Sequence, residues 1–422
     1  MIISDNRPRI GIRLQPENQL TFPVILHHLE SLNFHKILDL VILKDEDQLR
    51  YFISKRRPSL LLYSFMTPHI SRIADEILWI KQCRYESLSL VAGGPHTRGD
   101  PVSVLKMGFD YAFTGAVEMG FAHFVEQFTD GRLPDAPAVI HLPELDDLDR
   151  SFPMSQTLKT SPPLEITRGC YWNCKFCQTA CLKAIHRSFD SIQKYYEALK
   201  KRGHQRRINF ICPSAFEYKS SAGGHPAVEN IEQLLGYFQG SQTAHLEFGI
   251  FPSETRPNTF SGEMVKLVKR FCSNKQLTIG AQAGSDELLK ITRRGHTVED
   301  IRNACRLTAE HQLQPHVDFI FGFPGETSVH RRQTLRLIKE LYVNYQARTH
   351  LHYFIPLSGT DLADSQPREI DYRSLDTIEA YEKGGICTGW WREGQRLAEQ
   401  VLRMRERLRG KEVDYQELDW RE

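Results

Sequence analysis

The chain has 422 residues, of which 41% are hydrophobic and 25% are charged. This composition predicts a folded globular protein of two or three domains and excludes collagen-like and disordered chains. Lys and Arg number 54 against 52 Asp and Glu, so no global field recruits nucleic acid or an anionic membrane. The apolar runs are too short for a transmembrane segment, and the N-terminus lacks the pattern of a secretory signal. We therefore expect a cytoplasmic protein.

Short apolar runs alternate with stretches of helical period over residues 1–130. Helical periodicity covers, for example, residues 68–83 and 118–128. This pattern predicts a doubly wound, Rossmann-like α/β domain, which binds ligands at the carboxyl ends of its parallel strands. The five candidate strands are residues 9–14, 38–43, 59–63, 89–92 and 111–114.

A proline-rich stretch follows at residues 131–162, and we interpret it as a linker because six of the 21 prolines lie between Pro134 and Pro163. A second series of strands and helices then runs over residues 163–360 and predicts a partial (β/α)6 barrel. Its candidate strands are residues 164–167, 207–212, 245–251, 276–281, 316–321 and 348–355. Its candidate helices are residues 190–201, 230–238, 261–271, 297–311 and 329–345.

Residues 361–422 form a tail in which Leu397, Val401, Met404 and Leu408 recur at helical spacing. This apolar stripe predicts a helical C-terminal extension that docks on the rest of the chain. Its arginines alternate with glutamates, which indicates a solvated face rather than a nucleic-acid-binding surface.

Four of the nine cysteines fall between Cys170 and Cys181, directly after the first candidate strand of the second domain. Cys170, Cys174 and Cys177 have the spacing C-x3-C-x2-C, and the position after a strand puts them at the rim where barrel active sites lie. Three close thiolates suit an iron–sulfur cluster with one iron open to another ligand. The alternative is a zinc-stabilised binding module in which Cys181 supplies a fourth thiolate.

This spacing, with Phe176 directly before the third cysteine, resembles the signature of the radical S-adenosylmethionine (SAM) superfamily. The resemblance implies that Cys170, Cys174 and Cys177 hold a [4Fe–4S] cluster whose open iron chelates SAM. It also implies that one electron cleaves SAM to a 5′-deoxyadenosyl radical, and it adds Phe176 to the SAM-binding residues.

Two later segments resemble the strands that bind SAM in this superfamily. IGAQAGSDELLKITRRGHT contains Gln282, which the resemblance places against SAM, and Arg294, which it pairs with the SAM carboxylate. VDFIFGFPGET contains Asp318, which matches an acidic residue near SAM or is a strand residue satisfied by the backbone. Ser253 and Glu254 follow the third strand and face ribose or substrate, or cap a turn. The family's Gly-Gly-Glu element is replaced by ICPSAFEY.

The first domain resembles the cobalamin-binding domain that precedes the barrel in one branch of the superfamily, in YSFMTPHI, LVAGGPHTRGDP and MGFDYAFTGAVE. Small residues at strand ends let the backbone approach a bulky tetrapyrrole. No Asp-x-His-x-x-Gly motif follows the first strand, and the family's Gly-Glu-Gly-Glu reads Gly-Ala-Val-Glu here. The alternative is a domain that only supports the barrel. The resemblance implies as cobalamin-binding residues Ser64, Thr67, Gly93, Gly94, Pro95, Gly115 and Glu118.

Together these features predict an enzyme, a cobalamin-dependent radical SAM methyltransferase acting on a small molecule, lipid or natural product. Its cofactors would be a [4Fe–4S] cluster, SAM and cobalamin, and the resemblance implies flavodoxin or ferredoxin as electron donor. The alternative is a radical SAM enzyme of another reaction type, such as carbon–carbon bond formation or rearrangement, with a cobalamin-free first domain. No nucleic-acid partner is expected.

Overall fold

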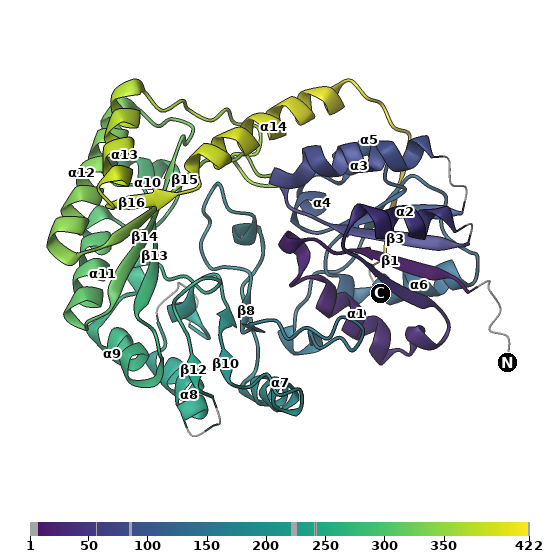
Figure 1. The fold of residues 1–422 in the computed structure, drawn as a ribbon, viewed down its shortest axis with the longest axis horizontal. Coiled ribbons are helices and arrows are strands. Elements are labelled where there is room, and N and C mark those ends of the chain that lie inside the picture. The colour runs from purple at the N-terminus through teal and green to yellow at the C-terminus, as the bar shows by residue number, and fades with distance from the viewer. Residues whose placement is uncertain are drawn as a thin grey trace. The chain divides into compact units, whose positions relative to one another are not determined.

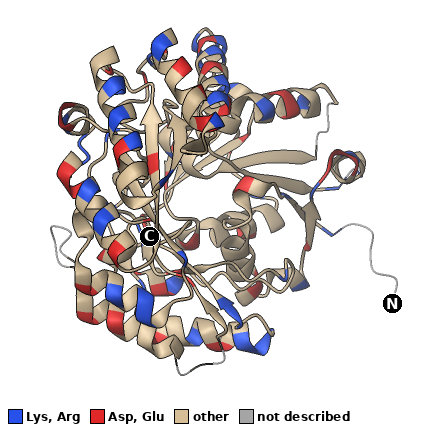
Figure 2. Ribbon diagram, turned by 60° about the vertical axis from the view of Figure 1, so that its left-hand side comes forward, with Lys and Arg blue, Asp and Glu red and all other residues tan. Residues whose placement is uncertain are grey.

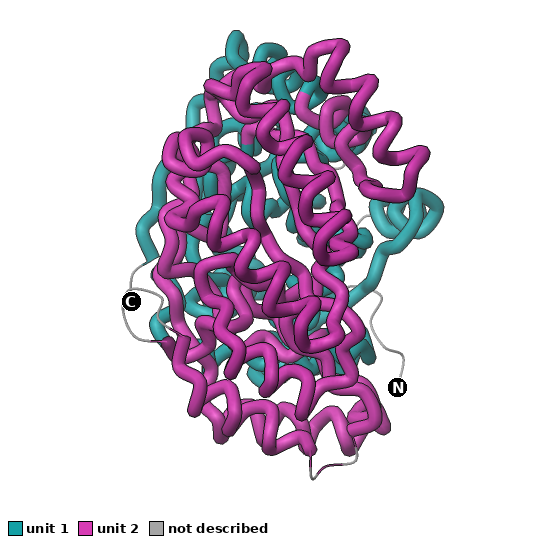
Figure 3. The backbone as a smooth tube through the Cα atoms, turned by 90° about the vertical axis from the view of Figure 1, so that its left-hand side faces the viewer, with its two compact units in different colours: residues 1–162, 357–359, 399–422 teal, residues 163–356, 360–398 magenta. Residues whose placement is uncertain are grey.

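The computed structural model describes residues 7–55, 57–83, 87–220, 226–239, 241 and 243–420. The chain divides into two compact units, shown in Figure 3. Unit 1 contains residues 1–162, 357–359 and 399–422, and unit 2 contains residues 163–356 and 360–398. Unit 1 therefore contains the predicted first domain and the proline-rich stretch, together with two segments from late in the chain.

Unit 1 is a seven-stranded sheet in the order β17-β6-β5-β4-β3-β1-β2, and all of its described pairs are parallel. This is the predicted doubly wound arrangement. The strands are β1 (Arg9–Arg13), β2 (Asp39–Leu43), β3 (Ser59–Ser64), β4 (Leu88–Gly93), β5 (Tyr111–Thr114), β6 (Ala138–His141) and β17 (Gln416–Asp419). The helices are α1 (Phe22–Ser31), α2 (Glu46–Ser54), α3 (Ile70–Gln82), α4 (Pro95–Gly99), α5 (Pro101–Met107) and α6 (Phe121–Thr129).

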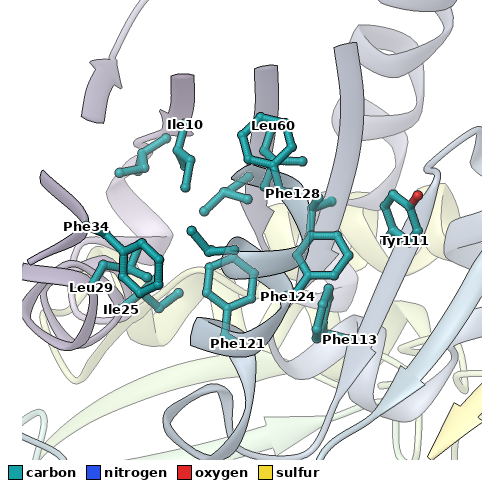
Figure 4. Packing of buried hydrophobic residues seen from close by; sticks show 14 of the residues in the cluster. Ile10, Ile25, Leu29, Phe34, Leu60, Tyr111, Phe113, Phe121, Phe124 and Phe128 are labelled. Carbon is teal, nitrogen blue, oxygen red and sulfur yellow. The ribbon is translucent and has the colours of Figure 1, made fainter. Parts of the chain in front are cut away.

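One face of this sheet packs against α1 and α6 through buried aliphatic and aromatic side chains (Figure 4). Phe113 on β5 makes edge-to-face contacts with Phe121 and Phe124 of α6, with ring centroids 5.4 Å and 5.0 Å apart. Burial of such rings is the main stabilising contribution of the core. This core supports the sheet, whose parallel strands all have their carboxyl ends at the same edge.

Two strands of this sheet were not predicted. β6 lies inside the stretch interpreted as a linker, and β17 lies in the tail expected to be helical. Both have four residues, and β17 has the polar sequence QELD. Such segments become strands only through their ladder partners, here β5 and β6, so periodicity does not identify them.

Unit 2 is the predicted partial barrel, built from short parallel strands. Thr255 forms a single parallel bridge with Ile279 of β13. This bridge connects the part of unit 2 that contains the two-stranded pairs with the part that contains the four-stranded sheet. The strand pairs are β7 (Leu164–Glu165) with β11 (Phe210–Ile211), and β10 (Arg207–Ile208) with β12 (His245–Leu246). A four-stranded sheet follows, from β13 (Gln276–Gln282) through β14 (Gln314–Phe321) and β15 (Arg348–Tyr353) to β16 (Cys387–Gly389).

Helices connect these strands and confirm the predicted series, with α10 and α13 in addition (Figure 1). Strong caps start them: Thr297 caps α11 and Thr327 caps α12, each in a capping box. The helices are α7 (Phe189–Lys201), α8 (Val228–Gln239), α9 (Gly262–Phe271), α10 (Asp286–Ile291), α11 (Val298–Glu310), α12 (Ser328–Tyr345), α13 (Tyr372–Lys383) and α14 (Trp391–Arg409). The last begins in unit 2 and ends in unit 1.

Acidic and basic residues alternate along the helices, as Figure 2 shows. Many form local ion pairs, such as Arg306 with Glu310 on α11 and Arg302 with Glu340 of α12. This mixing agrees with the near-zero net charge. None of the described helices is long and apolar enough to cross a membrane.

Candidate active site

The three predicted cluster cysteines lie in the loop that joins β8 (Thr167–Arg168) to β9 (Ile185–His186), a short antiparallel pair in unit 2. We call residues 169–184 the cysteine loop. It leaves β8 at Gly169, whose φ of +78° favours glycine and whose Cβ would lie 2.2 Å from the Lys183 carbonyl oxygen. A main-chain hydrogen bond from Cys170 to Leu182 (3.1 Å) closes the loop, and one from Lys175 to Thr292 (3.1 Å) holds it against the barrel.

Both aromatic residues after Cys170 anchor this loop. The Tyr171 hydroxyl donates to the Ser220 carbonyl (2.9 Å) and lies 2.6 Å from His186 Nε2. Burial lowers the pKa of His186 to about 4. Trp172 Nε1 donates to Glu217 Oε1 (2.7 Å). The residues between the first two cysteines therefore orient the loop.

Cys174 is the most enclosed of the three thiols and contacts two arginines. Arg294 Nη1 lies 3.3 Å and Arg256 Nη1 lies 3.6 Å from its Sγ. Burial alone would raise the pKa of Cys174, but the two guanidinium groups outweigh it and hold this pKa below its ordinary value. Cys170 differs, because burial raises its pKa to about 11. The thiolate, which is the form that binds metal, is thus more favoured at Cys174 than at Cys170.

The structure brings Gln282 and Arg294, the two residues assigned to SAM by resemblance, together at the end of β13. Gln282 sits at a register shift with a φ of +69°, and Arg294 Nη2 donates to the Gly280 carbonyl at 2.6 Å. Phe176 also lies here, with the Arg294 guanidinium 5.9 Å from its ring and the Phe323 ring 5.1 Å away. Cys174, Arg294 and the end of β13 therefore lie together in one candidate site.

Asp318 lies on β14, within 3.6 Å of His352 Nε2 on β15. Burial, together with the nearby Asp318 charge, raises the pKa of Glu254 to about 7. Ser253 precedes Glu254 and is buried, and its Oγ has no hydrogen-bond partner among the described residues. Asp318 and Glu254 therefore share one electrostatic environment.

Sequence reasoning missed two site residues. Glu217 is buried, burial raises its pKa, and its Oε2 has no hydrogen-bond partner among the described residues. It comes from ICPSAFEY, the segment that stands where the Gly-Gly-Glu element was expected. Arg256 follows the third strand in SETRP, two residues after Glu254. Its position after a predicted strand could have marked Arg256 as a site residue. Its contact with Cys174 could not be predicted, because the two residues are 82 positions apart in the chain.

No described group of three or more His, Cys, Asp or Glu side chains has the geometry to hold a single metal ion. Cys181 is exposed, and its Sγ contacts the Cys177 carbonyl. The described residues thus offer no preformed four-thiolate zinc site. The donor set, three thiols beside two guanidinium groups, suits an anionic iron–sulfur cluster.

In unit 1 the predicted cobalamin-binding residues lie at the carboxyl ends of β3, β4 and β5 and just beyond them. Gly93 has open space where a side chain would project, and Pro95 is exposed. Thr67, in contrast, is fully buried, and its Oγ1 contacts His96 Nδ1 (3.2 Å) and accepts from the Ser358 amide (3.1 Å).

The other predicted cobalamin-binding residues are partly enclosed by the chain itself. A Cβ on Gly94 would lie 2.6 Å from Ser64 Oγ, and one on Gly115 would lie 2.0 Å from the Leu142 carbonyl oxygen. Asn18 donates to the carbonyl of Ser64 at 3.0 Å. Glu118 is half-buried beside His28.

Residues 164–338 match the Radical SAM superfamily, so the chain contains a radical SAM domain. The fold is also similar to the folds of two solved cobalamin-binding radical SAM enzymes. It is similar to the radical SAM methyltransferase TsrM from Kitasatospora setae, solved with cobalamin and a [4Fe–4S] cluster bound (TM-score 0.62, 15% identity, 85% of this chain and 77% of that one). It is also similar to the cobalamin-dependent SAM radical enzyme OxsB with aqua-cobalamin bound (TM-score 0.58, 13% identity, 90% and 56%).

Among curated proteins, the chain is 25% identical over 252 residues to the tRNA-2-methylthio-N(6)-dimethylallyladenosine synthase of Polynucleobacter necessarius subsp. necessarius (strain STIR1). The match covers 57% of this chain and 54% of that protein. The chain thus spans about half the length of the curated relatives it matches. Their name is that of a synthase of a methylthiolated tRNA nucleoside, whereas TsrM is named as a methyltransferase.

Proposed function

We propose that this protein is a cobalamin-dependent radical SAM methyltransferase. The observation that carries the proposal is the contact of Arg294 with Cys174 at the end of β13, in a barrel preceded by a doubly wound domain. This puts a carboxylate-binding guanidinium beside the thiol that binds the cluster. The shared fold with TsrM and OxsB supports the domain order.

In this proposal Cys170, Cys174 and Cys177 hold the [4Fe–4S] cluster. Arg294 pairs with the carboxylate of SAM, and Glu217, with one free buried oxygen, accepts from its ammonium group. When bound, the reduced cluster supplies the electron that cleaves SAM to a 5′-deoxyadenosyl radical.

Further side chains of unit 2 would orient SAM or the substrate. Gln282, Asp318 and Ser253 are polar groups at or near strand ends of the barrel and are suited to the ribose hydroxyls. Phe176 and Phe323 would exclude water beside them.

Cobalamin would approach unit 1 at the carboxyl edge of its sheet, where no described atom lies within 4 Å of the Cβ position of Gly93. Glu118 and the glycines at 94 and 115 border this edge. A small-molecule, lipid or natural-product methyl acceptor and a flavodoxin or ferredoxin electron donor complete the proposal. We expect the protein to work in the cytoplasm.

The second candidate is a radical SAM enzyme of another reaction type with a cobalamin-free unit 1. The contacts of the Thr67 hydroxyl with His96 and Ser358 favour this second candidate, because they occupy a hydroxyl that cobalamin would otherwise bind.

Anaerobic purification with hydroxocobalamin tests both candidates. The methyltransferase proposal expects iron–sulfur absorbance, about one cobalamin per chain, and 5′-deoxyadenosine after reduction with SAM. A cluster with SAM cleavage but no bound cobalamin would favour the second candidate, and a colourless protein containing zinc would overturn both.

A further inference from the structure

Two buried arginines donate to one thiol, and the two are held very differently. Arg256 is 3% exposed and Arg294 is 7% exposed, and each directs Nη1 at Cys174 Sγ. Two adjacent guanidinium groups repel each other, so burial of both requires compensating partners besides the shared thiol.

Arg256 is fixed by partners within the chain. Its guanidinium lies 4.0 Å from the centre of the Trp172 ring, and its Nη2 donates to the main-chain carbonyl of Arg294. Trp172 is itself held by its hydrogen bond to Glu217. This stack joins Arg256 to the cysteine loop by contacts that need no ligand.

Arg294 has the same kinds of contact, but its aromatic contact is looser: the Phe176 ring lies 5.9 Å away, against 4.0 Å between Arg256 and the Trp172 ring. Apart from Cys174, its guanidinium donates to the Gly280 carbonyl and lies 5.9 Å from the Phe176 ring. It lies near Gln282 at the end of β13, since Gln282 Nε2 and Arg294 Nη2 both border Gly280, and parallel α/β folds bind ligands at the carboxyl ends of their strands. Arg294 can therefore leave Cys174 at a smaller cost in packing than Arg256.

We propose that Arg256 is a positioning residue that holds the cysteine loop through Trp172 and keeps a permanent N–H···S contact with Cys174, while Arg294 is released to bind the SAM carboxylate. The first half concerns the protein without cofactors, and the second half rests on the proposed function. Hydrogen bonds and charge at cluster sulfurs tune the cluster's reduction potential, so Arg256 also makes the cluster easier to reduce.

The first experiment uses the full chain without cluster and measures hydrogen–deuterium exchange over residues 170–177. Arg256→Met removes the stack and the N–H···S contact, and we expect exchange there to become about tenfold faster, because a charge-assisted contact is lost. Arg306→Met is the matched control: it removes an exposed arginine of α11 that pairs with Glu310. Unchanged exchange in R256M, relative to R306M, would overturn the proposal.

Arg256→Lys serves as the second variant, because burial of Met beside Cys174 risks misfolding. Lysine keeps the charge but lacks the planar guanidinium that stacks on an indole, so we expect faster exchange than in the wild type. Folded R256K with wild-type exchange would contradict the role of the stack.

The second experiment uses protein reconstituted with iron and sulfide. We expect R256M to have a more negative cluster midpoint potential while its SAM dissociation constant stays within about twofold of the wild type. Arg294→Met should raise that dissociation constant by at least about tenfold. An R256M protein with wild-type potential and weakened SAM binding would show that Arg256 is itself a SAM ligand and overturn the division between the two arginines.

Failure of the proposed function has a separate signature. Wild-type protein that takes up no cluster would refute the radical SAM proposal, while the exchange experiment would still decide whether Arg256 holds the loop.

Discussion

Gly295 lies against the indole ring of Trp172, so close that a Cβ at position 295 would be 2.4 Å from a ring carbon. Its φ of +71° also favours glycine. Gly295, the glycine of the Arg-Gly-His triplet, thus packs against Trp172 of the cysteine loop. This contact connects the two segments that carry the site.

Gly295→Ala should displace Trp172 and with it the cysteine loop. We expect a loss of about 1–3 kcal/mol in the free energy of unfolding, from backbone strain and steric overlap, and reduced iron uptake on reconstitution. Gly203→Ala is the control, because Gly203 has a similar φ of +75° but no atom within 4 Å of its Cβ position. Urea unfolding and iron analysis check both. Equal behaviour of the two variants would show that the overlap with Trp172 has no consequence.

Substitution of single cysteines should distinguish an iron–sulfur site from a zinc site. Cys170→Ser, Cys174→Ser and Cys177→Ser should each abolish the iron–sulfur absorbance, because each removes one of three protein ligands. Cys181→Ser should keep it, because Cys181 is exposed and lies outside the motif. Metal analysis of the four variants decides. Loss of bound zinc in all four would instead support a four-thiolate zinc site.

His96 should make unit 1 less stable in acid. Burial lowers the pKa of His96 to about 3. Below about pH 6.5, His96 therefore binds a proton in the unfolded chain but stays neutral in the folded chain until the pH approaches 3. The free energy of unfolding therefore falls as pH drops from 6.5 towards 3, and by pH 5 this one group costs about 2 kcal/mol. His96→Gln removes the titration while keeping a polar side chain beside Thr67 and Ser358. Urea unfolding at pH 5 and pH 7.5 measures the difference, and identical pH slopes in both proteins would contradict it.

The end of the chain should stabilise unit 1. Trp420 packs on Phe113 and Phe124 with ring centroids 6.4 Å and 6.0 Å apart, and it follows β17, which pairs with β6. Trp420→Ala should lower the free energy of unfolding by about 2 kcal/mol, less than for a fully buried tryptophan. Trp390→Ala is the control, because Trp390 is 68% exposed. Thermal unfolding of both variants checks this, and equal melting temperatures would show that the C-terminal segment does not support unit 1.

Local patterns in the sequence determined the class of the fold and the centre of the site. Helical and strand periods follow from side-chain burial within each segment, so the doubly wound domain and the barrel were predicted. The three cysteines proposed to hold the cluster lie within eight residues and follow a strand, so their place on a loop after that strand needed no tertiary information. Gln282 and Arg294 followed from a resemblance over one continuous stretch.

Only the tertiary structure decided which distant groups complete each site. Arg256 reaches Cys174 across 82 residues, Glu217 reaches Trp172 across 45, and Ser358 reaches His96 across 262. It also turned four residues of a presumed linker and four of a polar tail into strands β6 and β17. The physical reason is the same in each case. Contacts between distant segments depend on how burial of the core orients whole helices and strands. The residues that make such contacts show no periodic sequence pattern that would predict them.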